Sequence, residues 1–141
     1  MFTHEASICV GVPPGTGFGF LADPRNQVKI TPGLVAVSAT PPEDGFATRY
    51  QYELAGVTLS GQLTDSLRRP PTRLVRSLSG ALDGTVRYRL TATGNGTRIT
   101  CAMAIRVPRA VLNAVPTAVV ETRVEQEVTA TLSTLQSYLE H

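Results

Sequence analysis

Five polar side chains could do chemistry if the fold turned them toward one another. They are Tyr50, Tyr52, Tyr88, Arg76 and Glu121. A phenol donates a hydrogen bond, a guanidinium stabilises an oxyanion, and a desolvated carboxylate accepts a proton. Together they could orient a bound molecule and move a proton on it. A buried ion pair between Glu121 and Arg76 is the simpler use of those two residues.

Other reactive residue types are too few or too isolated to form a site. Cys9 and Cys101 lack the number and spacing of a disulfide framework or a metal site, so we interpret them as reduced thiols. His4 has no second usable histidine with which to hold a metal. The run from Gly15 to Gly19 lacks the third glycine of a dinucleotide site. We therefore expect no metal and no cofactor.

Composition indicates one globular unit. The chain has 141 residues, of which 42% are apolar and 17% charged, and its net charge is +2 without charged blocks. These values argue against disorder and against the basic footprint of a nucleic-acid binder. We expect a single domain over residues 1–141, with the last one to three residues interpreted as the remnant of a purification tag. No secretion signal and no long apolar run is evident, so we expect a cytoplasmic protein without stable membrane insertion.

Seven runs have the residue pattern of β-strands. The first is Phe2 to Val10, and six more lie between Pro32 and Pro108, each closed by a turn signal. Between the first two strands, Pro13-Pro14 and Asp23-Pro24 mark two short helices that would close one end of the sheet. The pattern predicts a curved antiparallel sheet with one apolar face.

Two hairpins can be put in register by parity, because facing residues on antiparallel strands point to the same side of the sheet. A turn at Ala55-Gly56 gives the pairs Leu54 with Val57, Tyr52 with Leu59, Tyr50 with Gly61, and Thr48 with Leu63. A turn at Gly94-Asn95 gives the pairs Leu90 with Ile99, Tyr88 with Cys101, and Val86 with Met103. In both hairpins the apolar residues collect on one face.

The turn near Asp83-Gly84 leaves two registers open. A three-residue loop from Leu82 to Gly84, with Gly84 in the left-handed conformation, turns Leu74, Arg76 and Leu78 inward. A two-residue loop instead turns inward Val75, Ser77 and Ser79. We favour the first register because it buries two leucines, and it also sends Arg76 inside.

A long amphipathic helix ends the chain. From Thr117 onward the helical period gives one apolar stripe, consisting of Val124, Val128, Leu132, Leu135 and Leu139, and an opposite face with Arg123, Glu127, Ser133 and Gln136. Pro116 should begin or kink this helix, so the segment from Pro108 to Val115 should be a separate turn or short helix. Glu121 falls on the apolar stripe and is the carboxylate that the pattern points inward.

The inward-facing set is too polar for a solid core. Each polar group buried without a partner costs roughly 1 to 3 kcal/mol. A sheet curved around one helix leaves space along its length, and walls of mixed polarity are typical of a small-molecule site. The sequence therefore predicts an internal cavity whose candidate ligand-binding residues are Thr48, Tyr50, Tyr52, Leu59, Leu63, Arg76, Tyr88, Met103, Glu121, Val124 and Val128.

The chain resembles the START-like superfamily, also called SRPBCC or helix-grip, and within it the polyketide cyclase and lipid-transport subgroup. The resemblance rests on five stretches: Val12 to Pro14, Phe18 to Pro24, Ile30 to Leu34, Gly96 to Thr100, and Thr131 to Glu140. It implies an α+β fold in which a seven-stranded antiparallel sheet grips a C-terminal helix around a hydrophobic cavity. Many members carry a tryptophan before the Pro-Gly turn, where this chain has Lys29-Ile30, and this departure concerns the class of ligand.

Three functions fit these observations. The first is binding or transport of a hydrophobic or amphiphilic small molecule, lipid-like or polyketide-like, without catalysis. The second, which the resemblance allows, is a cyclase or aromatase with Glu121 as base and a tyrosine or Arg76 as oxyanion partner. The third is an interaction role, in which the outer face of the sheet or the segment from Pro108 to Val115 contacts a partner protein or a membrane surface. The outer face carries Arg87, Arg89, Arg98 and Arg106. We favour the first, and expect a hydrophobic small molecule rather than a nucleic acid as the partner.

Overall fold

A computed structural model describes residues 1–39 and 47–140 of the chain. Its strands form one antiparallel sheet in the order β1-β7-β6-β5-β4-β3-β2. The strands are β1 Phe2–Val10, β2 Leu34–Ala39, β3 Ala47–Leu54, β4 Val57–Arg69, β5 Arg73–Gly80, β6 Asp83–Thr93 and β7 Gly96–Arg106. The helices are α1 Pro14–Ala22, α2 Arg25–Ile30, α3 Arg109–Ala114 and α4 Thr117–Leu139.

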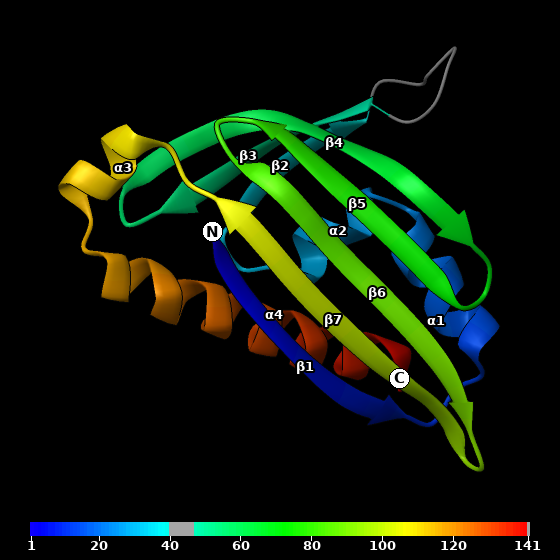
Figure 1. Ribbon diagram of the computed structural model, residues 1–141. Helices are drawn as coiled ribbons and strands as arrows, with labels where there is room; N and C mark the ends of the chain where they lie inside the picture. Colours follow the sequence, from blue (N-terminus) through cyan, green and yellow to red (C-terminus); the bar gives the residue numbers. More distant parts are fainter. Residues whose placement is uncertain (40–46, 141) are drawn as a thin grey trace.

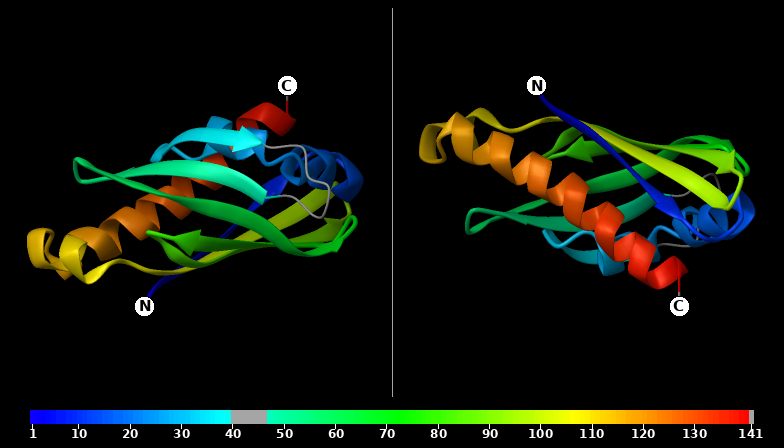
Figure 2. Two further views of the ribbon diagram at one scale, coloured as in Figure 1. Left: turned by 90° about the horizontal axis from the view of Figure 1, so that it is seen from above. Right: turned by 90° about the horizontal axis from the view of Figure 1, so that it is seen from below.

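The sheet curves around α4, the long C-terminal helix, which lies along its inner side (Figure 1). Views from above and below show α4 running the length of the sheet, with β1 beside it (Figure 2). The two short helices occupy one end, where α1 contacts β5 and β6, and α2 contacts β2 and α4. This is the helix-grip arrangement that the sequence predicts, with two short helices between the first and second strands.

Strand registers confirm the parity argument for both hairpins. Tyr50 faces Gly61, and Tyr52 faces Leu59, across β3 and β4. In the second hairpin, Tyr88 faces Cys101 across β6 and β7. A Cβ atom at Gly61 would lie 2.6 Å from the Tyr50 hydroxyl oxygen, so the missing side chain makes room for the tyrosine ring.

The turn between β5 and β6 differs from the predicted one. Leu78 pairs with Gly84, so the chain reverses at Ala81-Leu82, between the end of β5 and the start of β6, and not over the predicted loop from Leu82 to Gly84. Gly80 has a φ of +97°, which glycine adopts at little cost. Parity is unchanged by this shift, and Leu74 and Arg76 are buried as predicted.

Helix α4 begins after Pro116, and α3 precedes it as a separate element, as predicted. The buried residues of α4 form two overlapping lines along the helix axis. The first line, near the start, consists of Val120, Val124, Glu127 and Thr131, and the second, near the end, of Val128, Leu132, Leu135 and Leu139. The face that meets the sheet therefore moves around the helix along its length. No helix in the described ranges has the length and apolarity needed to cross a membrane.

This shift corrects the predicted orientation of two glutamates. Glu121 is exposed, whereas Glu127, which was expected to face away, is 2% exposed. Glu121 shares the angular position of the second line, which contacts the sheet only in the later part of α4. In the first turns of α4, where Glu121 lies, the first line contacts the sheet instead. The buried residues of a helix that packs against a curved sheet do not follow one straight stripe.

Candidate functional site

A small cavity lies between the inner face of the sheet and the first half of α4. Its volume is about 50 Å³. Most of its lining is aliphatic, contributed by Leu34, Leu54, Leu63, Leu78, Leu82, Val86, Met103, Ile105, Val120 and Val124. The polar lining residues are Gln27, Thr31, Tyr52, Arg76 and Arg123. The cavity is thus an apolar space with a few polar groups in its wall.

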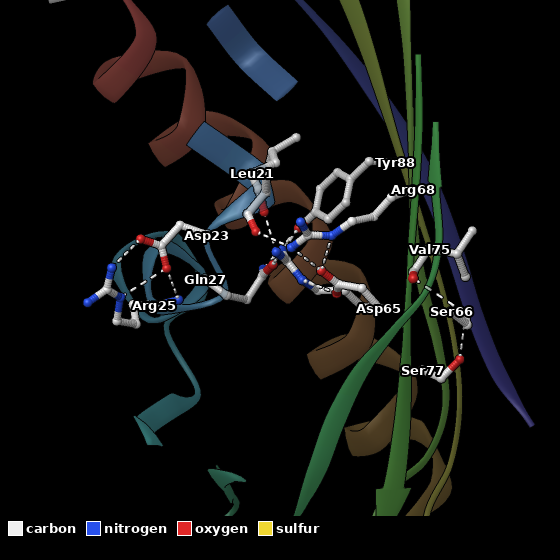
Figure 3. Close-up of polar contacts among 12 residues, drawn as sticks. Leu21, Asp23, Arg25, Gln27, Asp65, Ser66, Arg68, Val75, Ser77 and Tyr88 are labelled. Carbon is white, nitrogen blue, oxygen red and sulfur yellow. Dashed lines mark hydrogen bonds and ion pairs between the residues drawn. The ribbon is translucent and has the colours of Figure 1, made fainter. Parts of the chain in front are cut away.

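Arg76 brings together partners from three other elements. Its side chain is 1% exposed, and Nε donates to Asp65 Oδ1 at 3.0 Å. Nη1 donates to Gln27 Oε1 at 2.8 Å, and Nη2 donates to the carbonyl of Leu21. Arg68 donates to the other oxygen of Asp65 at 2.7 Å. Figure 3 shows Gln27, Asp65 and Arg68 converging between the sheet and the short helices.

Gln27 extends this cluster toward α4. Its Nε2 donates to the Thr31 hydroxyl at 2.7 Å and to the Tyr88 oxygen at 2.9 Å. The Tyr88 hydroxyl in turn donates to Gln27 Oε1 at 3.1 Å, and the Thr31 and Thr131 hydroxyls are 3.0 Å apart. A continuous chain of hydrogen bonds therefore joins β4, β5 and β6 through α2 to α4.

A second polar cluster lies at the other flank of the cavity. Arg123 Nε donates to Glu127 Oε1 at 3.0 Å, and its guanidinium lies 5.7 Å from the centre of the Tyr52 ring. The backbone N–H of Gly33 donates to the same carboxylate oxygen at 2.9 Å. Glu127 Oε2 is buried and has no hydrogen-bond partner among the described residues. Arg123 and Tyr52 thus form a contact anchored by a buried carboxylate.

Burial keeps several groups around the cavity protonated. It raises the pKa of Tyr88 and Tyr52 well above the ordinary phenol value, and the Glu127 charge raises that of Tyr52 further. Burial also raises the pKa of the Cys101 thiol from 9.0 to about 12. These side chains are neutral at physiological pH and act as hydrogen-bonding or apolar groups rather than as anions.

The predicted cavity residues divide into three groups. Those that line the cavity are Tyr52, Leu63, Arg76, Met103 and Val124. Those that are buried in the packing around it are Thr48, Tyr50, Leu59, Tyr88 and Val128. Glu121 is exposed and takes no part. Tyr50 has a structural role, because its oxygen accepts from the Leu82 N–H at 3.1 Å and so holds the β5–β6 turn. Ligand binding by these residues stays a prediction.

Sequence reasoning missed several polar residues of the site, among them Gln27, Thr31, Asp65, Arg123 and Glu127. Asp65 could have been found, because it lies two positions after the inward-facing Leu63 on one strand. The i,i+4 spacing of Arg123 and Glu127 signals an ion pair but not its burial. Gln27 lies in a six-residue helix, which is too short for periodicity to reveal its inner face.

Asp65→Asn should strongly destabilise the protein. The substitution removes the negative partner of a guanidinium that stays buried, and breaking such a pair costs about 3 to 5 kcal/mol. Urea unfolding followed by circular dichroism measures this loss. Asp23→Asn is the control, because Asp23 pairs with Arg25 at the surface and its loss should hardly shift the midpoint. Equal effects of the two substitutions would contradict a structural role for the buried pair.

Stability should fall as the pH rises above about 9. The folded Cys101 thiol holds its proton up to about pH 12, whereas the unfolded thiol releases it near 9.0, so alkaline pH favours the unfolded chain. Between pH 8 and pH 10 we expect Cys101 to contribute a loss of about 1 kcal/mol in the free energy of unfolding, in addition to a smaller loss from each of the buried Tyr52 and Tyr88, measured by urea titration. Cys101→Ala should reduce this loss, whereas Cys9→Ala, at an exposed thiol, should leave it unchanged. An unaltered loss in Cys101→Ala would refute the assignment.

Solved structures with similar folds cover nearly the whole chain. Protein TTHA0849 from Thermus thermophilus has a TM-score of 0.82 at 12% identity, covering 97% of this chain and 96% of its own. A START superfamily protein from Mycobacterium smegmatis has a TM-score of 0.76 at 11% identity, covering 99% and 97%. The Zhui aromatase/cyclase from a Streptomyces species has a TM-score of 0.73 at 16% identity, covering 97% and 92%. At these identities the likeness concerns the fold alone.

Sequence comparison identifies the family of the chain, which the similarity of folds does not. No curated protein matches the chain significantly. The family described as polyketide cyclase / dehydrase and lipid transport matches residues 1–140. The match spans the sheet, the short helices and α4, which together enclose the cavity. The chain therefore belongs to the polyketide cyclase / dehydrase and lipid transport family.

Proposed function

We propose that the protein binds a hydrophobic or amphiphilic small molecule, lipid-like or polyketide-like, in the cavity between the sheet and α4. The observation that carries this proposal is the lining, which is aliphatic over most of its area and polar only at a few fixed groups. Such walls are typical of sites that bind apolar molecules and orient them by a few hydrogen bonds. Membership of a family that includes lipid-transport proteins supports the same reading.

Binding rather than catalysis is favoured by the chemistry of the lining. Among the described residues that line the cavity there is no carboxylate, histidine or thiol to act as a base. Glu121, the base considered for a cyclase, is exposed. Arg76 faces the cavity, but three of its five N–H groups already donate to protein oxygens, so the guanidinium is held in a structural network.

The size of the cavity requires that its wall move when a ligand binds. A volume of about 50 Å³ holds only a few water molecules. Drug-sized ligands occupy sites of roughly 300 to 1,000 Å³. Two surface hollows of about 430 and 300 Å³ lie near the N-terminal end of α4, and Arg123 lines both of them as well as the cavity. Arg123 therefore borders the inner space and both outer ones, and the Tyr52 ring against which it lies faces the inner space. Displacement of these two side chains would join the spaces into one site.

The first test is binding itself, with cis-parinaric acid and 1-anilinonaphthalene-8-sulfonate as fluorescent probes. We expect saturable binding of one probe molecule per chain, weakened at least about tenfold by Val124→Phe, which fills the cavity. Thr129→Phe, on the exposed side of the same helix, should bind normally. Met103→Phe serves as a second filling variant, and each variant must unfold cooperatively to be compared. Absence of saturable binding, or equal binding by all variants, would refute the proposal.

The second test concerns the route into the cavity. Tyr52→Ala removes the ring over which Arg123 lies while leaving the Arg123–Glu127 ion pair in place. If the ring closes the site, stopped-flow fluorescence should show probe association at least about fivefold faster than in the wild type, because a conformational step no longer limits it. Tyr138→Ala, at a partly exposed tyrosine near the C-terminal end of α4, is the control. Unchanged rates in Tyr52→Ala would place the opening elsewhere without affecting the binding proposal.

A further inference from the structure

The outer face of the sheet carries arginines that stand directly opposite one another. Across β4 and β5, Arg69 faces Arg73, and across β5 and β6, Arg73 faces Arg89. Arg87 lies two residues before Arg89 on the same strand and therefore on the same face. Arg87 and Arg89 alternate along β6 with the buried Val86, Tyr88 and Leu90, so their side chains lie on the outer side of the sheet. Figure 1 shows α4 on the other side of the sheet. Arg69, Arg73, Arg87 and Arg89 are spread over positions 69 to 89 of the sequence. They form one cluster only because their strands pair.

Nothing within the described part of the chain neutralises this cluster by a direct ion pair. The ion pairs among described residues join Arg25 to Asp23, Arg68 and Arg76 to Asp65, and Arg123 to Glu127. Like charges placed directly opposite each other on paired strands destabilise a sheet. The arrangement therefore works against folding stability, and an anionic partner would relieve it.

The arginines border a groove rather than a flat surface. It has a volume of about 120 Å³, with Arg73, Arg87 and Arg89 along it and the smaller Thr100 and Ala102 in its floor. Glu5 also lines the groove. It lies on β1, where it faces Ala102 on β7, and Ala102 in turn faces Arg87 on β6. The backbones of Glu5 and Arg87 are therefore two strand spacings apart, about 10 Å. The size suits a carboxylate side chain surrounded by guanidinium groups.

We propose that this groove is a docking surface for a partner protein that presents clustered carboxylate side chains. Guanidinium groups bind carboxylates through paired, charge-assisted hydrogen bonds, and complementary charge both speeds association and selects the partner. The groove lies on the opposite side of the sheet from the cavity, so docking leaves α4 and the cavity mouth accessible. The proposal does not depend on what the cavity binds.

Two other anionic partners fit the groove less well. A membrane surface is usually engaged with apolar anchors, and the large apolar side chains most exposed in the described chain lie outside the groove, at Met1, Val35, Val57, Leu112, Val119 and Tyr138. Single-stranded nucleic acids are usually bound with aromatic stacking, but the Tyr88 side chain beneath the groove is 2% exposed. A net charge of +2 for the whole chain also falls short of a nucleic-acid footprint.

The test compares two triple variants that carry the same change in net charge. The first replaces the groove residues (Arg73→Gln, Arg87→Gln, Arg89→Gln), and the second replaces exposed arginines elsewhere (Arg49→Gln, Arg106→Gln, Arg109→Gln). The probe is a fluorescein-labelled peptide of ten residues in which glutamate and glycine alternate, and binding is followed by fluorescence anisotropy. We expect the groove variant to bind at least about tenfold more weakly than the wild type, and the control variant to lose less than about threefold.

Two further measurements complete the test. Added salt should weaken wild-type binding, and the groove variant should show a smaller dependence on salt. The groove variant should also unfold at a temperature no lower than the wild type, since it removes facing like charges. Equal weakening in both triple variants would show attraction by net charge alone and overturn the proposal. It would also be overturned if the groove arginines were required for binding to phosphatidylserine vesicles or to single-stranded RNA, and not for binding to the peptide.

Discussion

The buried guanidinium of Arg76 is the constraint on which the interior of this protein depends. A charge that is 1% exposed needs a counter-ion and a full set of acceptors, because an unpaired buried charge is strongly destabilising. Here the acceptors come from β4, α1 and α2, so satisfying one side chain joins both short helices to the sheet. Arg68 strengthens this connection by donating to the carbonyl of Ala22 at the end of α1.

The same cluster sets the character of the cavity. Because Arg76 and Gln27 are bound to each other and to neighbouring groups, they present a fixed polar end to a space that is otherwise aliphatic. The other polar flank is different, since Arg123 is 32% exposed and Glu127 Oε2 lacks a partner among the described residues. One flank is thus held by a saturated network and the other by fewer contacts. Motion is easier where fewer buried contacts must be broken.

The two faces of the sheet differ in the chemistry of their side chains. Its inner face is mostly apolar and closes a cavity with α4, whereas its outer face between β4 and β6 carries arginines around a groove, and none of them forms an ion pair with another described residue. The alternation of side chains along a strand makes this division possible, because neighbouring residues such as Tyr88 and Arg89 belong to opposite surfaces. A bound molecule and a partner protein could therefore occupy the chain without competing for the same residues.

The sequence alone determined the order of the elements and the registers of two hairpins, because these follow from local alternation and from turn residues near each strand. It favoured the burial of Arg76 but left a second register open, and the structure decided between the two. It also pointed to α4 as the cover of the sheet. Only the tertiary structure decided which carboxylate faces inward: the curved sheet shifts the buried line along α4, so Glu127 is buried and Glu121 is exposed. The partners of Arg76 and the facing of Arg73 with Arg89 depend on how distant segments pack and pair, and no local pattern contains that information.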